Sequence, residues 1–236
     1  MQDLLRDMVG PSRSDPGLAG ADTLQERVAA WLRHAIVTGR YPPGERLVQA
    51  DIADHLKVSL TPVREAMRDL AAEGLLTLSP RRGVTVRLLT LPEVQELRML
   101  CALLERTCGE LIAQRITEDE LAHARWLDRT MWSLSALEDY FAFNNRFHLF
   151  LYETARSPDL TAILRRIHDA KMPYLPATFL RARMRHRDGL QEHRRFLDAC
   201  TARDAPAAGE IMMRHFDAMF DQIEQIIAES TPDPAP

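Results

Sequence analysis

The sequence of 236 residues contains no apolar run of the roughly 20 residues that a membrane-spanning helix needs. Its first 22 residues include acidic side chains and no continuous apolar segment, so they lack the pattern of a secretory signal. The three cysteines, Cys101, Cys108 and Cys200, show neither paired nor metal-type spacing. These absences argue against membrane-spanning and secreted proteins and predict a protein of the reducing cytoplasm.

Sequence motifs of several enzyme classes are also absent. The chain has no H-E-x-x-H helix motif, no Gly-rich phosphate loop and no nucleophile elbow. What it does have is 46% hydrophobic and 27% charged residues, a composition typical of a folded protein with a substantial core. We therefore expect a non-enzymatic protein of one or two domains.

Charge is distributed unevenly along the chain, whose net charge is -4. Residues 21–90 hold ten Arg and Lys against eight Asp and Glu, whereas residues 91–236 hold eighteen against twenty-three. The front segment is therefore the plausible partner for a polyanion such as nucleic acid.

Composition also predicts the domain boundaries. Gly, Pro, Ser and Asp cluster in residues 1–22 and in the tail 231–236, which we expect to be a disordered arm and a disordered tail. Pro92 in "TLPEV" marks the entry to a new helix. We therefore predict a first domain over residues 23–90 and a second over residues 91–230.

Hydrophobic spacing in the first domain predicts three helices and a β-hairpin. An apolar stripe runs from Leu24 to Thr38, and a short helix follows in which Ile52, Ala53 and Leu56 face inward. The third helix lies within "VSLTPVREAMRDLAAEGLL", residues 58–76, and ends at Gly74. Alternating apolar residues on both sides of residues 80–83 then predict the hairpin. This order is that of a winged helix-turn-helix.

The third helix has the features of a helix that enters the major groove of DNA. Its N-terminal end is polar, its open face carries arginines, and its other face is apolar. The candidate DNA-binding residues are Ser59, Thr61, Arg64 and Arg68 on this helix and Arg81, Arg82 and Gly83 at the hairpin tip. The alternative is a solvated helix whose arginines pair with Glu65, Asp69 and Glu73.

The block "VSLTPVREAMRDLAAEGLL" followed by "RRGVTV" resembles the N-terminal domain of GntR-type bacterial transcription regulators over about 70 residues. The resemblance implies that Ser59, Thr61 and Arg64 contact operator DNA and that Gly83 lies at the turn of the wing. Many members carry Arg where this chain has Leu60, so the resemblance implies one major-groove contact fewer here.

The second domain has a helical pattern throughout, and we predict no strand beyond the hairpin. The expected helices cover residues near 92–115, 118–133, 136–155, 158–171, 174–185, 188–202 and 205–229. The fold class is therefore mainly α, with an N-terminal winged helix-turn-helix and a C-terminal helical bundle.

Three histidines lie on the apolar faces of separate predicted helices. His148 follows Asn144 by one helical turn, and His193 and His215 lie on two later helices. Three imidazoles and one side-chain oxygen can bind an ion such as Zn²⁺ or Ni²⁺ and leave one position open. The alternative is three separate core histidines, and the spacing by itself leaves both interpretations open.

The helical domain resembles the effector domain of the FadR subgroup, the FCD domain, in which Asp-x-x-x-His and two later histidines bind a metal. The matching positions are Asn144, His148, His193 and His215, the last two in "EHRRFLDACTARDAPAAGEIMMRHF". Asn144 stands where the family has Asp, which removes one negative charge.

The resemblance also implies an arginine on the first helix of this domain, near Glu105. The aligned residue is Cys101, and Arg98, about one turn earlier, is our candidate effector-binding residue. Its alternative role is a surface arginine beside Glu93 and Glu96.

These features predict a ligand-responsive transcription regulator, a repressor that binds double-stranded operator DNA as a homodimer. By resemblance it senses a small carboxylate through a pocket that contains Zn²⁺ or Ni²⁺. The alternatives are a regulator that holds an acyl ligand without metal and a metal-dependent hydrolase fused to a DNA-binding module. For the hydrolase, Asp139 and Glu153 are the candidate general bases.

Overall fold

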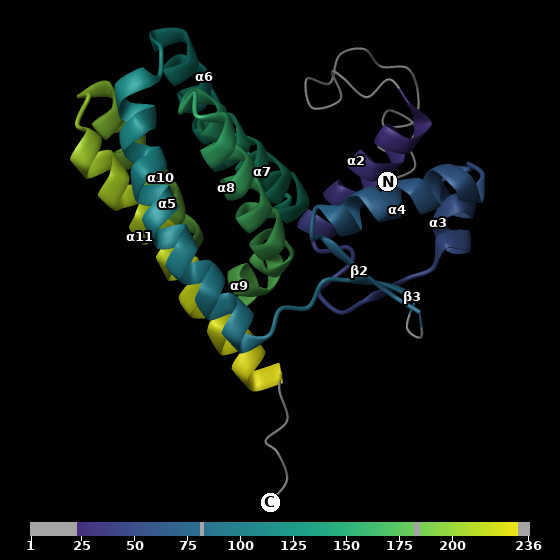
Figure 1. The fold of residues 1–236 in the computed structure, drawn as a ribbon. Coiled ribbons are helices and arrows are strands. Elements are labelled where there is room, and N and C mark those ends of the chain that lie inside the picture. The colour runs from purple at the N-terminus through teal and green to yellow at the C-terminus, as the bar shows by residue number, and fades with distance from the viewer. Residues whose placement is uncertain (1–22, 81–82, 182–184, 231–236) are drawn as a thin grey trace, which may run out of the picture. The chain divides into compact units, whose positions relative to one another are not determined.

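The computed structural model describes residues 23–80, 83–181 and 185–230 (Figure 1). The predicted arm, the predicted tail and the two hairpin-tip residues Arg81 and Arg82 lie outside these residues. The chain forms two compact units, and the second consists of Val37–Gly39 and the chain from Leu89 onward. None of the helices in the described part of the chain is long and apolar enough to cross a membrane.

The helices of the first unit are α2 (Leu24–Val37), α3 (Gln49–Leu56) and α4 (Leu60–Ala72). They share one hydrophobic core because each carries apolar residues at helical spacing. The apolar face of α4 is fully buried, with Val63, Ala66, Met67 and Leu70 at most 1% exposed. Gly74 ends this helix with a φ of +86°, a conformation that costs glycine little. The three predicted helices are confirmed.

The hairpin consists of β2 (Leu76–Ser79) and β3 (Gly83–Val86), which pair antiparallel with Leu78 opposite Val84. The structure adds a strand that the sequence did not predict, β1 (Arg46–Leu47), which pairs with the other edge of β3. The sheet order is therefore β1-β3-β2. Two residues are too few to show an alternating pattern, and β1 depends on its hydrogen bonds to β3.

The second unit is helical, as predicted. Its elements are α5 (Leu91–Arg115), α6 (Glu118–Ser133), α7 (Leu137–Thr154), α8 (Pro158–Lys171), the 3₁₀ turn η1 (Met172–Tyr174), α9 (Leu175–Arg181), α10 (Arg185–Thr201) and α11 (Ala205–Ser230). The largest differences from the prediction concern α9 and α10. Helix α9 ends at Arg181, four residues before the predicted end near residue 185, and α10 begins three residues earlier than expected, at Arg185 rather than near residue 188.

Helices α5 and α11 run side by side along most of their length (Figure 1). Two glycines permit this close approach. A Cβ atom on Gly109 of α5 would lie 2.8 Å from the carbonyl oxygen of Ala208, and a Cβ on Gly209 of α11 would lie 2.8 Å from that of Arg106. The two backbones therefore lie in direct contact at these glycines, and α11 carries one of the three candidate metal ligands.

Candidate metal centre and nucleic-acid interface

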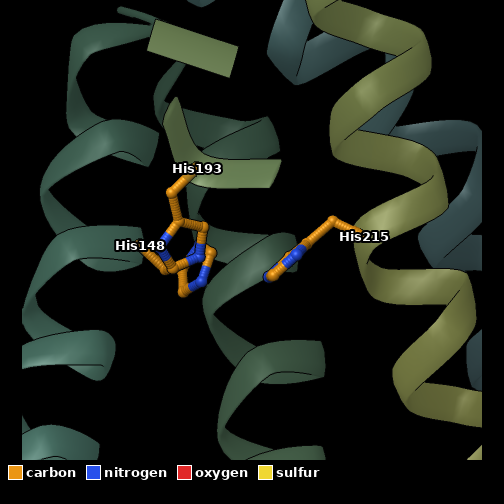
Figure 2. Close-up of side chains that lie close together, drawn as sticks. All are labelled: His148, His193 and His215. Atoms are coloured by element: carbon orange, nitrogen blue, oxygen red, sulfur yellow. The ribbon is translucent and has the colours of Figure 1, made fainter. Parts of the chain in front are cut away.

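The three histidines that the sequence singled out converge in the structure. His148 comes from α7, His193 from α10 and His215 from α11, and their imidazoles point toward one another (Figure 2). The ring centres are 4.9 to 5.2 Å apart, and one nitrogen of each ring lies within 4.8 Å of one nitrogen of the others. Each helix is held in place by its apolar face, so the core fixes the positions of the imidazoles.

Burial affects the pKa of His148, the most buried of the three histidines. His148 is 1% exposed, and burial first, then the neighbouring His193 and His215, hold its pKa well below the usual 6.5. Neither ring nitrogen of His148 has a hydrogen-bond partner among the described residues. A neutral imidazole with an available lone pair is the form that binds a metal, so the residues present fit a divalent ion.

Two carboxylates lie beside the imidazoles. The Oε2 atom of Glu192 is 2.7 Å from Nδ1 of His215, and Oδ1 of Asp128 is 3.9 Å from Nδ1 of His193. Asp128 also pairs with Arg194 and is 3% exposed. Only the Glu192 contact is within hydrogen-bonding distance.

Two cavities adjoin the cluster. The smaller has a volume of about 10 Å³ and is lined by all three histidines, which is close to the space that one water molecule occupies. The larger has a volume of about 340 Å³ and lies between α9, α10 and α11 with Tyr140 of α7 at its edge. His215 and Glu192 line both cavities, so the histidine cluster opens toward the larger one through these two residues.

The fourth predicted ligand, Asn144, lies on α7 one turn before His148 and is 6% exposed. It lines neither cavity, and its role as a ligand stays a prediction.

The predicted effector-binding residue Arg98 is engaged elsewhere. Its guanidinium binds Asp217 through two hydrogen bonds of 2.7 and 3.0 Å and lies 2.6 Å from a carboxylate oxygen of Asp221. These bonds, above all those to Asp217, raise its pKa. Arg98 therefore joins α5 to α11, and it lines neither cavity.

A different cation lies inside the bundle. Lys171 of α8 has no exposed surface, and its Nζ lies 3.2 Å from the centre of the Phe216 ring and 3.8 Å from Oε1 of Glu105. Tyr152 donates a hydrogen bond of 2.5 Å to the same oxygen of Glu105. The Phe216 ring centre is in turn 4.9 Å from that of His148, so this buried ion pair adjoins the histidine cluster.

In the first unit, the polar residues of α4 lie on its open side. Ser59 is the N-cap of the helix, and its hydroxyl oxygen accepts no hydrogen bond from the backbone amides of the first turn. Thr61 and Arg64 are exposed. Arg68 lies 2.9 Å from Glu65, the pairing that the solvated-helix interpretation predicts, whereas we find no ion pair of Arg64 among the described residues. Gly83 begins β3 with a φ of +76°.

The candidate bases of the hydrolase alternative lie away from the cluster. Asp139 and Glu153 are both exposed, and Glu153 binds Arg165 on α8 at 2.6 Å. The carboxylate found beside the imidazoles is Glu192, and the sequence reasoning missed it. Its position directly before His193 in the chain was visible, but its partner is His215, 23 residues away on another helix.

A winged helix-turn-helix joined to a helical domain with a buried, polar-lined site defines a class of proteins, the DNA-binding transcription regulators. Two family models match the chain. Bacterial regulatory proteins of the gntR family match residues 24–86, and the FCD domain matches residues 96–218. The chain belongs to the GntR family of transcription regulators and carries an FCD domain.

Named relatives agree with this assignment. The Nta operon transcriptional regulator of Aminobacter aminovorans is 28% identical over 193 residues, which cover 81% of this chain and 90% of that protein. The transcriptional repressor RspR of Escherichia coli strain K12 is 26% identical over 219 residues, which cover 88% and 92%.

Solved structures show the same fold. McbR/YncC of E. coli superposes with a TM-score of 0.73 at 23% identity and covers 88% of this chain and 98% of its own. A putative GntR regulator from Rhodococcus sp. RHA1 superposes with a TM-score of 0.69 at 25% identity, with the same coverage. The relatives are regulators, and they give no support to the hydrolase alternative.

Proposed function

We propose that this chain is a cytoplasmic, metal-containing repressor that releases operator DNA when a small carboxylate binds its helical domain. The observation that carries the proposal is the convergence of His148, His193 and His215 from three helices onto one buried point. Buried imidazoles without a ligand are costly, and three of them sharing one small space are the donor set of Zn²⁺ or Ni²⁺.

The three histidines would hold the ion, with the side-chain oxygen of Asn144 as the proposed fourth ligand. Such an ion supplies a Lewis-acidic position at which a carboxylate oxygen can bind. The chain's own residues do the rest. Burial keeps His148 neutral, and Phe147, Leu151 and Phe196 form the apolar wall of the small cavity beside the histidines.

The effector would occupy the larger cavity, whose volume of about 340 Å³ lies in the range of small-molecule sites. The cavity reaches the cluster at His215, so a carboxylate at that end meets the metal. Its other walls offer polar groups from Thr178, Gln191, Arg195 and Gln222, which can bind a second polar group of the ligand. Small acids with a second polar substituent are therefore the class we propose.

The DNA-binding residues we propose are Ser59, Thr61 and Arg64 on α4, with Arg68 as a more weakly supported contributor because it pairs with Glu65. Arg81, Arg82 and Gly83 at the wing complete the proposed surface.

The protein is proposed to act as a homodimer, since a single winged domain contacts few base pairs. Exposed apolar side chains on α5 support this. Met99 is 60% exposed and Leu103 is 67% exposed, and apolar side chains of this kind mark interaction surfaces.

One experiment tests the central claim. Purified protein is stripped with a chelator, and its melting temperature is measured with no addition, with Zn²⁺ or Ni²⁺, and with metal plus each member of a panel of small carboxylates. Because a ligand of the folded state stabilises it, we expect metal to raise the melting temperature and an effector to raise it further. The same effector should weaken binding to operator fragments selected from genomic DNA.

Three outcomes would contradict the proposed function. Replacing all three histidines with Gln should abolish the metal response, and a chain in which it persists binds metal elsewhere. If fatty acids stabilise the stripped protein and metal does not, the acyl-sensing alternative holds instead. No preference for any genomic fragment over random duplex would exclude the regulator.

A further inference from the structure

Glu192 occupies a position between the two cavities of the helical domain. It lies on α10 directly before His193, and its carboxylate reaches across to α11, where Oε2 lies 2.7 Å from Nδ1 of His215. The side chains are partly covered, with 32% of Glu192 and 17% of His215 exposed. It is thus a charged group beside the candidate metal centre whose role the proposed ligand set leaves open.

The contact determines which nitrogen of His215 can bind an ion. A carboxylate is an acceptor, so a neutral His215 must carry its proton on Nδ1 in order to donate to Glu192. That tautomer leaves the lone pair on Nε2. Carboxylates that hold metal-binding imidazoles in this way orient the ring and increase its basicity.

An ordinary ion pair is the competing explanation. The position of His215 favours a shared site instead, because its ring centre lies 5.2 and 4.9 Å from those of His148 and His193, the other two proposed ligands.

Charge gives Glu192 a second role. The ligand at position 144 is an amide, so the proposed ligand set of three imidazoles and Asn144 carries no negative charge to offset a divalent cation. Asp128 lies 3.9 Å from His193 but is also bound to Arg194. Glu192 is in hydrogen-bonding contact with His215, one of the proposed ligands.

We propose that Glu192 is a positioning residue of the metal centre, which fixes the Nδ1–H tautomer of His215 and supplies through it the negative charge that Asn144 lacks. The inference rests on the proposed metal site. It assigns to this chain a carboxylate–histidine pair, formed before any ion binds, in place of a directly binding aspartate.

The first measurement is metal affinity by competition with a chromophoric chelator, using full-length protein and Zn²⁺. We expect Glu192→Ala to weaken binding about 10- to 100-fold and Glu192→Gln to have an intermediate effect, since Gln keeps an acceptor but loses the charge. The matched control is Glu153→Gln, the same change at an exposed glutamate bound to Arg165, which should leave affinity unchanged.

Two further measurements separate positioning from a merely structural role. Nitrogen-15 NMR of the histidines in metal-free protein should show His215 as the Nδ1–H tautomer in the wild type and a mixture in Glu192→Ala. In the Glu192→Gln background, Asn144→Asp should restore most of the lost affinity, because it returns one negative charge to the site.

The inference is overturned if Glu192→Gln and Glu192→Ala both bind Zn²⁺ within twofold of the wild type, or if metal-free wild-type His215 carries its proton on Nε2. These outcomes differ from failure of the proposed function, in which the wild type itself binds no Zn²⁺ and the three-histidine variant behaves like it.

Discussion

Arg64 and Arg68 are alike in type and one helical turn apart, yet the structure gives them different surroundings. Arg68 lies 2.9 Å from the Glu65 carboxylate, and both arginines are exposed. An arginine that is already paired must lose its partner before it binds a base edge, and an unpaired one need not. The two residues are therefore unequal candidates for DNA recognition.

We expect Arg64→Ala to weaken operator binding by about 1–3 kcal/mol and to relax the preference for one base pair of the site. Arg68→Ala should have a smaller effect, because an arginine that is paired with Glu65 is less available to DNA in the wild type. Affinities for operator and random duplex at one fixed salt concentration measure both. Equal losses for the two variants would mean that the Glu65 pair does not persist in solution.

A second residue-scale feature is Glu105, which is fully buried against Cys101, Cys108, Tyr152 and Lys171. Burial raises its pKa to about 7, while Lys171 and the hydrogen bond from Tyr152 act in the opposite direction. Because the folded-state pKa lies above the usual 4.5, the folded protein binds the proton more tightly than the unfolded chain does. The stability that this provides is present below pH 4.5 and is lost as the pH rises through about 7.

The Glu105→Gln variant isolates this contribution, since Gln cannot titrate. Between pH 4.5 and pH 8 we expect the free energy of unfolding of the wild type to fall relative to the variant by about 3 kcal/mol, at 1.36 kcal/mol per pKa unit. Urea unfolding of both proteins across this range gives the difference. A constant difference would show that Glu105 ionises in the folded protein as readily as in the unfolded chain.

At the scale of helices and strands, the contact between α5 and α11 depends on Gly109 and Gly209. Alanine normally stabilises a helix relative to glycine by up to about 1 kcal/mol. Here the added Cβ of Gly109→Ala would lie 2.8 Å from the carbonyl oxygen of Ala208, which belongs to backbone and cannot rotate away. The higher helix propensity of alanine stabilises the variant, whereas the steric clash destabilises it. We expect the clash to be the larger effect.

We therefore expect Gly109→Ala to lower the free energy of unfolding by about 1–3 kcal/mol, the usual cost of overpacking. Gly189→Ala in α10 is the matched control. Its Cβ would meet only the Cε1 atom of His215 at 3.8 Å, an ordinary contact, so stability should stay level or rise. The melting temperatures of the two variants and the wild type, measured by thermal unfolding, test this prediction. An unchanged melting temperature for Gly109→Ala would mean that the two helices can move apart without loss of stability.

The elements themselves were largely predictable from the sequence, and particular residues show why. The buried face of α4 consists of Val63, Ala66, Met67 and Leu70. These residues repeat at helical spacing, so the sequence pattern was enough to predict this helix. Strand β1 was not predictable, because two residues have no pattern. The convergence of the three histidines could not be predicted from their spacing in the sequence, because it depends on how α7, α10 and α11 pack against one another.

Cross-helix contacts between side chains were the least predictable feature. Arg98 was placed near the effector by its position on α5, but three carboxylates on α11 hold it. Glu192 was overlooked because its partner lies 23 residues away. Such pairings depend on side-chain rotamers and helix register, which leave no periodic signal in the chain.

At the scale of the whole molecule, the exposed leucines and Met99 of α5 are relevant to assembly. Leu103→Glu places a charge on this face at little expected cost to the fold, since Leu103 is 67% exposed. If two copies meet here, we expect the variant to be monomeric in light scattering at micromolar concentration and to lose at least tenfold in operator affinity. A dimeric Leu103→Glu would place the interface on another face.

The contact between α5 and α11 at the two glycines also affects how movement of one helix is transmitted to the other. Where side chains separate two helices, small movements of one are absorbed by rotation of those side chains before they reach the other. At Gly109 the backbone of α5 lies directly against that of α11, and Arg98 joins the two helices by hydrogen bonds to Asp217. If the proposed ion binds His215, we expect a displacement of α11 to move α5 as well, and α5 begins at Leu91, shortly after the first unit ends at Leu88.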